Sequence, residues 1–249
     1  QANNDFYRVT MSGDVPNTPR KLLEANSGGI YGWWGINFAW GSDGRLIYAR
    51  PDQIGIVDQE KGFLRPMMEI APLQTNSDWA WIPPMVWGTE ARTLFVVIHA
   101  PAPAPMTEEG SPYFNLTAIS MINDATATLV QNVGMFAYPS ASPVRPSNKE
   151  RSYQVAFLQA IFPEQSETSR YRVVVMDRDG SDQHVIFPPA DSVGLGQPQT
   201  PVWAPQPIEG QAGDFLAIIY QGNLWLVDSK SGQAFQVTND GLLVKIDWK

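Results

Sequence analysis

The sequence predicts an all-β fold made of many short strands, and two observations support this prediction. First, short segments alternate between apolar and polar side chains, and each is bounded by Gly, Pro, Asn, Asp or Ser, which end strands and form turns. Second, helical periodicity is nearly absent, because residues 20–25 are the one stretch rich in helix formers and are too few for a stable helix. The clearest expected strands are 6–11, 45–49, 93–99, 116–122, 171–176, 215–220 and 223–228.

These strands recur in a repeated unit. Each unit begins with a strand that ends in Trp or Pro, continues through an apolar strand and a strand ending in Asp, and closes with a Gly turn and a last strand. The units start near Trp40, Trp87, Pro143, Trp203 and Trp248, at intervals of 47, 56, 60 and 45 residues. Four-stranded blades of a β-propeller need about 40–50 residues each, and surface loops lengthen some of them. We therefore predict a β-propeller of four-stranded blades, about five of them, as a closed ring or as a fragment of a larger ring.

We expect a single domain over residues 1–249, with a composite or truncated blade formed by residues 1–25 and 244–249. Residues 6–14 fit the third strand of a blade and its turn, residues 19–23 fit the fourth strand, and residues 244–249 fit a first strand. Pairing of the two ends would remove exposed sheet edges, which invite aggregation. That blade would lack its second strand, and we expect residues preceding Gln1 to supply it.

Several motifs in the repeats resemble those of TolB-type propellers, a WD-repeat-like family. Residues 40–48 (WGSDGRLIY) are similar to the WSPDG-and-strand signature, and residues 175–180 (VMDRDG) are similar to the third strand and its turn. Residues 203–205 (WAP) match the start of the signature, and one copy alone keeps Ser-Asp-Gly. The resemblance covers most of the chain. It implies a non-catalytic binding or scaffold module of an exported bacterial protein, periplasmic or on the cell surface, with its ligand at the ring face.

Composition limits the partners. The chain has 17 basic and 25 acidic residues, a net charge of −8, which disfavours nucleic acid as a partner. No apolar stretch approaches the roughly 20 residues that span a bilayer. The chain has no cysteine, which excludes disulfides and thiolate metal sites. We therefore expect a protein, peptide or glycan ligand, and a chain that does not span a membrane.

No catalytic motif is present, and we predict no catalytic residue, no cofactor and no metal site. The chain has two histidines and no Gly-x-Ser-x-Gly elbow. The acids of residues 177–182 are spaced like those of a calcium loop, but Gly180 stands fourth instead of sixth, and a β-turn explains them equally well. Two alternatives stay open: the propeller part of a prolyl-oligopeptidase-like protein, and a carbohydrate-active propeller enzyme, which would need facing carboxylates. Its candidate carboxylates are Asp43, Asp78, Glu90 and Asp214.

Four tryptophans form the predicted ligand-binding site. Trp34 precedes Trp40 by six positions, and Trp81 precedes Trp87 by six. Residues just before the first strands of two neighbouring blades lie on one face of a propeller, so these rings should gather at its mouth. Tryptophan offers a large flat surface with one polar group, which suits sugars and peptide side chains. The predicted ligand-binding residues are Trp33, Trp34, Trp79 and Trp81. The other interpretation is that these rings pack between blades.

Overall fold

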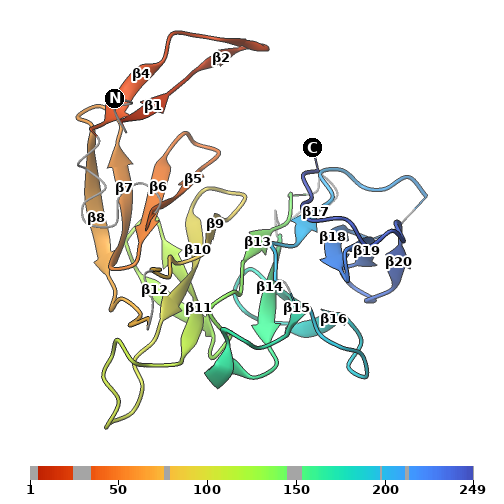
Figure 1. Cartoon of the computed structure of the whole chain (residues 1–249). Coiled ribbons are helices and arrows are strands. Elements are labelled where there is room, and N and C mark those ends of the chain that lie inside the picture. The colour runs from red at the N-terminus through yellow and green to blue at the C-terminus, as the bar shows by residue number, and fades with distance from the viewer. Residues whose placement is uncertain are drawn as a thin grey trace. The chain divides into compact units, whose positions relative to one another are not determined.

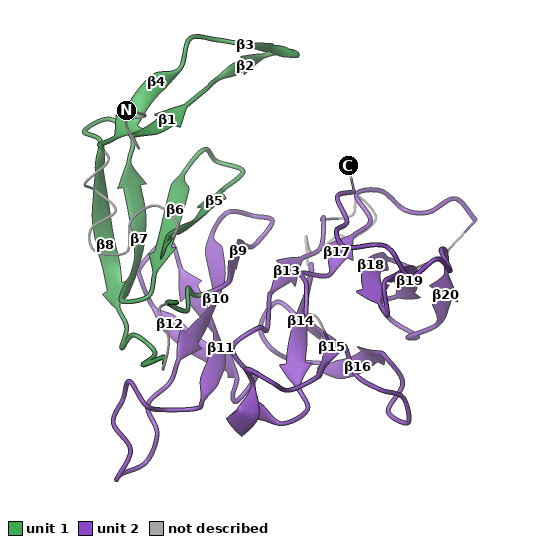
Figure 2. Ribbon diagram, viewed as in Figure 1, with its two compact units in different colours: residues 1–83 green, residues 84–249 purple. Residues whose placement is uncertain are grey.

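Antiparallel strands account for nearly all the regular structure of the described residues (Figure 1). The computed structural model describes residues 5–24, 35–75, 79–144, 153–196, 198–210 and 213–248. The chain divides into two units, residues 1–83 and 84–249 (Figure 2). The described part contains no helix long and apolar enough to cross a membrane.

Unit 1 holds one four-stranded sheet and a small N-terminal β-structure. The sheet runs in the order β5 (Asn37–Trp40), β6 (Leu46–Arg50), β7 (Gln53–Asp58) and β8 (Phe63–Glu69). The N-terminal part pairs β1 (Phe6–Arg8) with β4 (Arg20–Leu23), and β2 (Met11–Ser12) with β3 (Val15–Pro16). One core cluster, which includes Leu23, Leu46 and Tyr48, joins β4 to the sheet. Gly55 is required opposite Tyr48, because a side chain there would overlap the Tyr48 ring.

Unit 2 holds three four-stranded sheets, each built from strands that are consecutive in the sequence. The second sheet contains β9 (Met85–Trp87), β10 (Thr93–His99), β11 (Phe114–Ser120) and β12 (Thr126–Val130). The third contains β13 (Ser140–Ala141), β14 (Gln154–Ala160), β15 (Tyr171–Asp177) and β16 (His184–Phe187). The fourth contains β17 (Val202–Trp203), β18 (Phe215–Tyr220), β19 (Asn223–Asp228) and β20 (Ala234–Gln236). A short 3-10 helix, η3 (Pro163–Gln165), lies in the loop between β14 and β15.

The first strands of successive sheets in unit 2 are neighbours. β13 lies beside both β9 and β17, and the Trp203 indole Nε1 donates a hydrogen bond of 3.0 Å to the Ser140 carbonyl. The middle strands β10, β14, β15 and β18 are almost fully buried, because each sheet packs its faces against other parts of the fold. A core that includes Leu158, Val173 and Leu216 joins the third sheet to the fourth. Four-stranded sheets stacked face to face in chain order, with their first strands together, are the blades of a β-propeller.

Each of the four fuller repeats of the sequence contains one four-stranded sheet. Trp40, Trp87 and Trp203 are the last residues of the first strands β5, β9 and β17, and Pro143 follows β13 by two residues. The chain is thus an all-β protein with the blades of a propeller.

The C-terminal segment departs from the expectation of a fifth first strand. Residues 243–248 form no strand, and β1 pairs with β4 alone among the described residues. The backbone of the segment is bound elsewhere: the Leu243 N–H donates to the Gly222 carbonyl (2.8 Å), and the Gln199 amide donates to the Val244 carbonyl (2.9 Å). These bonds hold the segment against the fourth blade. The single domain and the composite blade stay predictions.

Candidate functional site

A groove of about 850 Å³ lies between the second and third blades of unit 2. We call it the interblade groove. Its lining comes from the β9–β10 turn, from the outer strands of the second blade and from the β15–β16 turn of the third blade. The lining residues are Glu90, Arg92, Thr93, Ala118, Ser120, Ile122, Ala125, Thr126, Ala127, Leu129, Arg178 and Asp179.

Small side chains on one face of the second blade create the hollow. Thr93 lies opposite Ser120, and Ala118 lies opposite Ala127, in the ladders β10–β11 and β11–β12. Residues directly opposite each other in antiparallel strands project from the same face of the sheet. These small alanine, serine and threonine side chains do not fill this part of the face, so a hollow remains between it and the neighbouring blade.

The β15–β16 turn forms the opposite wall. The Gly180 N–H donates to the Asp177 carbonyl at 2.9 Å, and Gly180 has a φ of +88°, which favours glycine. The turn packs on β12, since a Cβ added at Gly180 would lie 3.2 Å from the Leu129 Cβ. The Asp179 carboxylate accepts hydrogen bonds from the Ser181 hydroxyl (2.6 Å) and N–H (3.0 Å), and these bonds lower its pKa. The acid-rich segment 177–182 is therefore a hydrogen-bonded turn. Within the described residues, no three His, Asp or Glu side chains gather as metal ligands would.

The groove-lining carboxylate of Glu90, which is half-buried, pairs with the buried Tyr153. The Tyr153 hydroxyl donates to Glu90 Oε1 at 2.8 Å, and the Thr93 hydroxyl donates to the same oxygen at 3.1 Å. Burial, followed by the bond to Glu90, raises the pKa of Tyr153. Gly88 makes room for the pair, because a Cβ there would overlap the Tyr153 hydroxyl. Glu90 Oε2 is buried and has no hydrogen-bond partner among the described residues.

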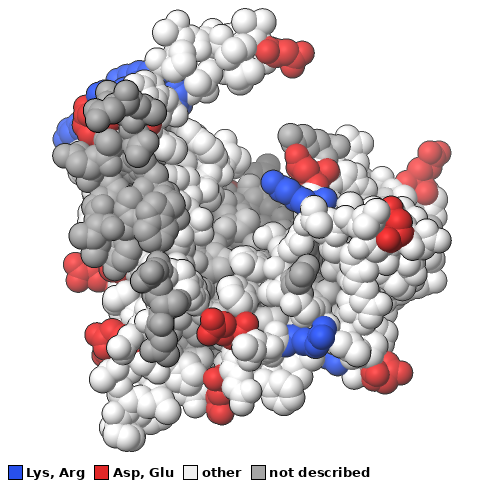
Figure 3. Space-filling model, viewed as in Figure 1, with Lys and Arg blue, Asp and Glu red and all other residues white. Residues whose placement is uncertain are grey.

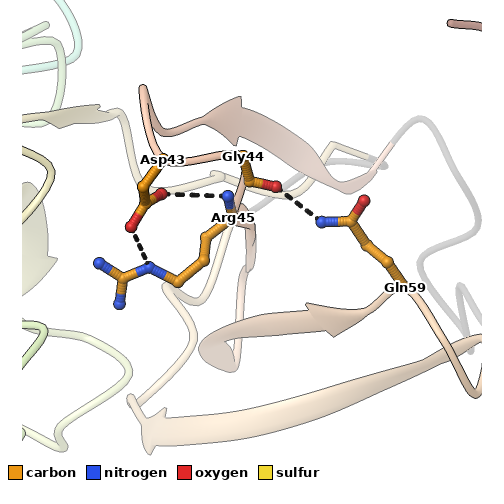
Figure 4. A network of polar contacts seen from close by, with 4 residues as sticks. All are labelled: Asp43, Gly44, Arg45 and Gln59. Atoms are coloured by element: carbon orange, nitrogen blue, oxygen red, sulfur yellow. Dashed lines mark hydrogen bonds and ion pairs between the residues drawn. The ribbon is translucent and has the colours of Figure 1, made fainter.

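Glu90 and Asp43 occupy equivalent positions in two repeats, but their carboxylates make different contacts. Each stands three residues after the first-strand tryptophan, Trp87 or Trp40. Asp43 folds back on its own turn, where its carboxylate accepts from the Arg45 backbone N–H (3.1 Å) and side-chain Nε (2.6 Å) (Figure 4). Glu90 is one methylene longer and reaches the next blade. The substitution of Glu for Asp at this position is the sequence signal that could have identified the contact.

Two arginines from different blades line the groove. Arg92 belongs to the β9–β10 turn and Arg178 to the β15–β16 turn, and both are exposed. Neither forms an ion pair with another described residue. The Arg178 guanidinium carbon lies 6.0 Å from the centre of the Tyr153 ring, within the range of a cation–π contact. Among the described residues on the face drawn in Figure 3, acidic and basic side chains form small separate groups.

The predicted tryptophan site is only partly described. Trp33 and Trp34 lie outside the described residues. Trp79 is 37% exposed, whereas Trp81 is 3% exposed, as expected of a ring that packs in the interior. The ligand-binding role of the four rings stays a prediction.

The other residues considered for chemistry have local roles or lie outside the described residues. Asp78 is not described, and the Asp214 carbonyl accepts from the Ser229 N–H at 2.8 Å. His99 is buried, with its Nε2 2.7 Å from the Ser111 carbonyl oxygen. The His184 ring lies 2.9 Å from each of two backbone carbonyl oxygens, those of Asp182 and Ser229.

A second, smaller pocket of about 370 Å³ lies in unit 2 beside the C-terminal segment. Its lining is mostly apolar and includes Tyr138, Leu195, Ile218 and Val244. It offers fewer charged groups than the interblade groove, with Lys245 its one charged lining residue among those described.

The sheets define the class of protein: a β-propeller of several blades. No protein-family model matches the chain, and no curated protein matches it. Solved structures do. A TolB-type protein from Agrobacterium tumefaciens is 13% identical over 95% of this chain and 74% of its own, with a TM-score of 0.50. An α-L-arabinanase from Penicillium chrysogenum, solved with arabinobiose, is 12% identical over 93% of this chain and 71% of its own, with a TM-score of 0.49. At 13% identity, the likeness to the TolB-type protein establishes the propeller fold alone.

Proposed function

We propose that this chain is a non-catalytic binding module whose interblade groove takes an extended peptide segment of a partner protein. One observation carries the proposal: the groove, whose walls are strands and tight turns, contains polar groups that have no hydrogen-bond or ion-pair partner among the described residues. These groups are the guanidinium groups of Arg92 and Arg178, which have no carboxylate within ion-pair distance among the described residues. A cleft with a few convergent polar groups is the usual form of a binding site.

The position of β12 favours a peptide. β12 has one ladder partner, β11, so its other edge presents unpaired backbone groups within the described sheet. An extended peptide can add to such an edge through main-chain hydrogen bonds. A glycan is less favoured there, because none of the described lining residues is aromatic and sugars pack on aromatic rings.

The carboxylates of the groove support a non-catalytic role. Glycoside hydrolysis needs two carboxyl groups that face each other across the substrate. Here Glu90 is turned toward Tyr153 and Asp179 toward Ser181. The extracytoplasmic setting that we propose for the module is supported by the TolB-like repeat motifs alone. Fractionation of cells that express the gene with its native upstream sequence would test that setting.

Filling the groove tests the proposal. The full chain would be screened against a displayed library of random peptides, and the binders would be measured with the Ala127→Trp variant. Ala127 faces the groove, and a tryptophan there should abolish binding of the selected peptides. Thr128→Trp is the matched control, because Thr128 is also exposed and its side chain projects from the opposite face of the same strand. Equal loss in both variants, or in neither, would reject the groove as the site.

A further inference from the structure

We infer that unit 2 has a second ligand site, which binds one ring of a neutral sugar and lies beside the short helix η3. The site is a pocket of about 200 Å³, which we call the η3 pocket. Its lining comes from the β10–β11 loop, from the connection between β12 and β13, and from the β14–β15 loop that contains η3. A pocket of this volume suits a single small ring rather than an extended segment. The inference does not depend on the peptide site proposed above.

The η3 pocket and the interblade groove lie at opposite ends of the second blade. Thr93, the first residue of β10, lines the groove. His99, the last residue of β10, pairs with Phe114, which follows the pocket residue Tyr113. At about 3.3 Å per residue, the seven residues of β10 place these two ends roughly 20 Å apart. One small ligand therefore cannot occupy both, and a substitution in one should leave the other unchanged.

Two aromatic residues from different blades line the η3 pocket. Phe162 belongs to the β14–β15 loop of the third blade and is 64% exposed. Tyr113 belongs to the β10–β11 loop of the second blade and is half-buried. A single exposed apolar side chain needs no explanation, but here two aromatic rings line one hollow, together with Ile161. Aromatic rings offer a flat apolar surface, which suits the C–H face of a sugar ring.

Hydrogen bonds fix the backbone of the pocket before a ligand binds. The Phe162 N–H donates to the Ser169 hydroxyl at 3.0 Å. Asn132 has a φ of +55°, in the left-handed region, and two side chains from neighbouring strands hold it there. Its N–H donates to Asn115 Oδ1 (3.0 Å), and its carbonyl accepts from the Gln159 amide (2.8 Å). A strained backbone that its surroundings fix is typical of binding sites, and a preformed site loses less entropy on binding.

The polar side chains of the lining suit hydroxyl groups. The side-chain amides of Asn132 and Gln165 are exposed, and neither forms a hydrogen bond with another described residue. Each amide offers both a donor and an acceptor, and a sugar hydroxyl can use either. The one charged residue of the described lining is Glu164, whose carboxylate accepts from the Tyr113 hydroxyl at 3.4 Å. A carboxylate repels a sugar that carries its own carboxylate, so the lining favours a neutral sugar.

The test uses the full chain on an array of neutral and uronic-acid oligosaccharides. We expect neutral glycans to bind, and Phe162→Ala to weaken them about tenfold because it removes the more exposed ring. Gln165→Ala should weaken the same glycans severalfold. Phe63→Ala is the matched control, because Phe63 is also exposed (42%) but lies in β8, outside the pocket lining. Uronic-acid glycans should bind more weakly than neutral ones, and Glu164→Gln should reduce that difference.

The outcomes separate this site from the peptide site. Glycans lost in Phe162→Ala but kept in Ala127→Trp would support the η3 pocket, whether or not the groove binds peptides. The inference is overturned if the unmodified chain binds no neutral glycan, if Phe162→Ala keeps its glycans, or if Ala127→Trp loses them. Equal loss in Phe162→Ala and Phe63→Ala would overturn it too. Because Phe162 and Gln165 are exposed, both alanine variants should melt like the unmodified chain, and thermal melts check this.

Discussion

The Tyr153 hydroxyl of the third blade donates a hydrogen bond of 2.8 Å to the Glu90 carboxylate of the second blade. The two residues are 63 positions apart in the sequence, and each lies at the start of its blade's second strand or in the turn before it. The bond joins neighbouring blades at a residue that lines the interblade groove, so it links the stability of unit 2 to the shape of the candidate site.

Tyr153→Phe should therefore destabilise the chain. It leaves Glu90 with the Thr93 hydroxyl as its one remaining donor on Oε1, while Oε2 already lacks a partner among the described residues. An unsatisfied buried polar group costs about 1–3 kcal/mol. We expect a loss of that size in the free energy of unfolding, measured by urea titration. Tyr113→Phe is the control, because the Tyr113 hydroxyl makes a longer bond of 3.4 Å to exposed Glu164. Equal effects of the two substitutions would contradict the importance of the buried pair.

Gly88→Ala should act through the same pair. The added Cβ would overlap the Tyr153 hydroxyl and lie 3.0 Å from Glu90 Oε2. Overpacking of this kind costs about 1–3 kcal/mol. In the double variant Gly88→Ala, Tyr153→Phe, removal of the hydroxyl relieves the overlap, so the two losses should be less than additive. Gly110→Ala, in an exposed loop, controls for the glycine change. Strict additivity in a double-mutant cycle would show that the methyl group does not meet Tyr153.

The sequence predicts the blades better than it predicts the groove. Repeat starts such as Trp40 and Trp203 are visible because strand alternation and turn residues recur at a regular interval. The groove depends on Ala118 and Ala127, and an alanine in a strand carries no signal of its own. Its walls depend on how the β15–β16 turn meets β12 of the preceding blade, a long-range contact that no local pattern encodes. The sequence likewise gives the positions of the tryptophans, but it does not show which of their rings are buried in the fold.

His184 should make stability depend on pH. Its Nδ1 is 2.9 Å from the Asp182 carbonyl oxygen, and its Nε2 is 2.9 Å from the Ser229 carbonyl oxygen in the fourth blade. A neutral imidazole has one N–H, so the protonated ring alone can donate to both. Burial opposes protonation, but these two hydrogen bonds, with the charges of Asp182 and Asp177, outweigh it and raise the pKa of His184 above 6.5.

The sign of the pH dependence follows from that raised pKa. A group whose pKa is higher in the folded state contributes stability that is fully present below its unfolded pKa, and this contribution is lost as pH rises through the folded pKa. His184→Gln should therefore reduce the free energy of unfolding more at about pH 5.5 than at about pH 8.5. Urea titrations of both proteins across this range measure the difference. A difference that does not change with pH would mean that protonated His184 does not join the blades.

Substitutions of Trp81 and Trp79 should distinguish the two interpretations of the tryptophans, ligand binding and packing in the interior. Trp81 is 3% exposed, and truncation of a buried tryptophan to alanine costs about 3–5 kcal/mol. Trp81→Ala should lower the melting temperature strongly. The Trp79 side chain is 37% exposed. The Thr75 hydroxyl donates to the Trp79 backbone carbonyl at 2.6 Å, and a side-chain substitution leaves this acceptor in place. Trp79→Ala should therefore melt close to the unmodified chain.

Binding then decides the role of Trp79. If its ring contacts a ligand at the ring face, Trp79→Ala should lose signal on a glycan or peptide array while the fold remains intact. The same array probed with Ala127→Trp identifies the ligands that use the interblade groove. Ligands lost in Trp79→Ala but kept in Ala127→Trp would place a separate recognition site at the tryptophans. If Trp79→Ala keeps every ligand, the ligand-binding role of Trp79 is wrong. If Trp81→Ala melts like the unmodified chain, the core role of Trp81 is wrong.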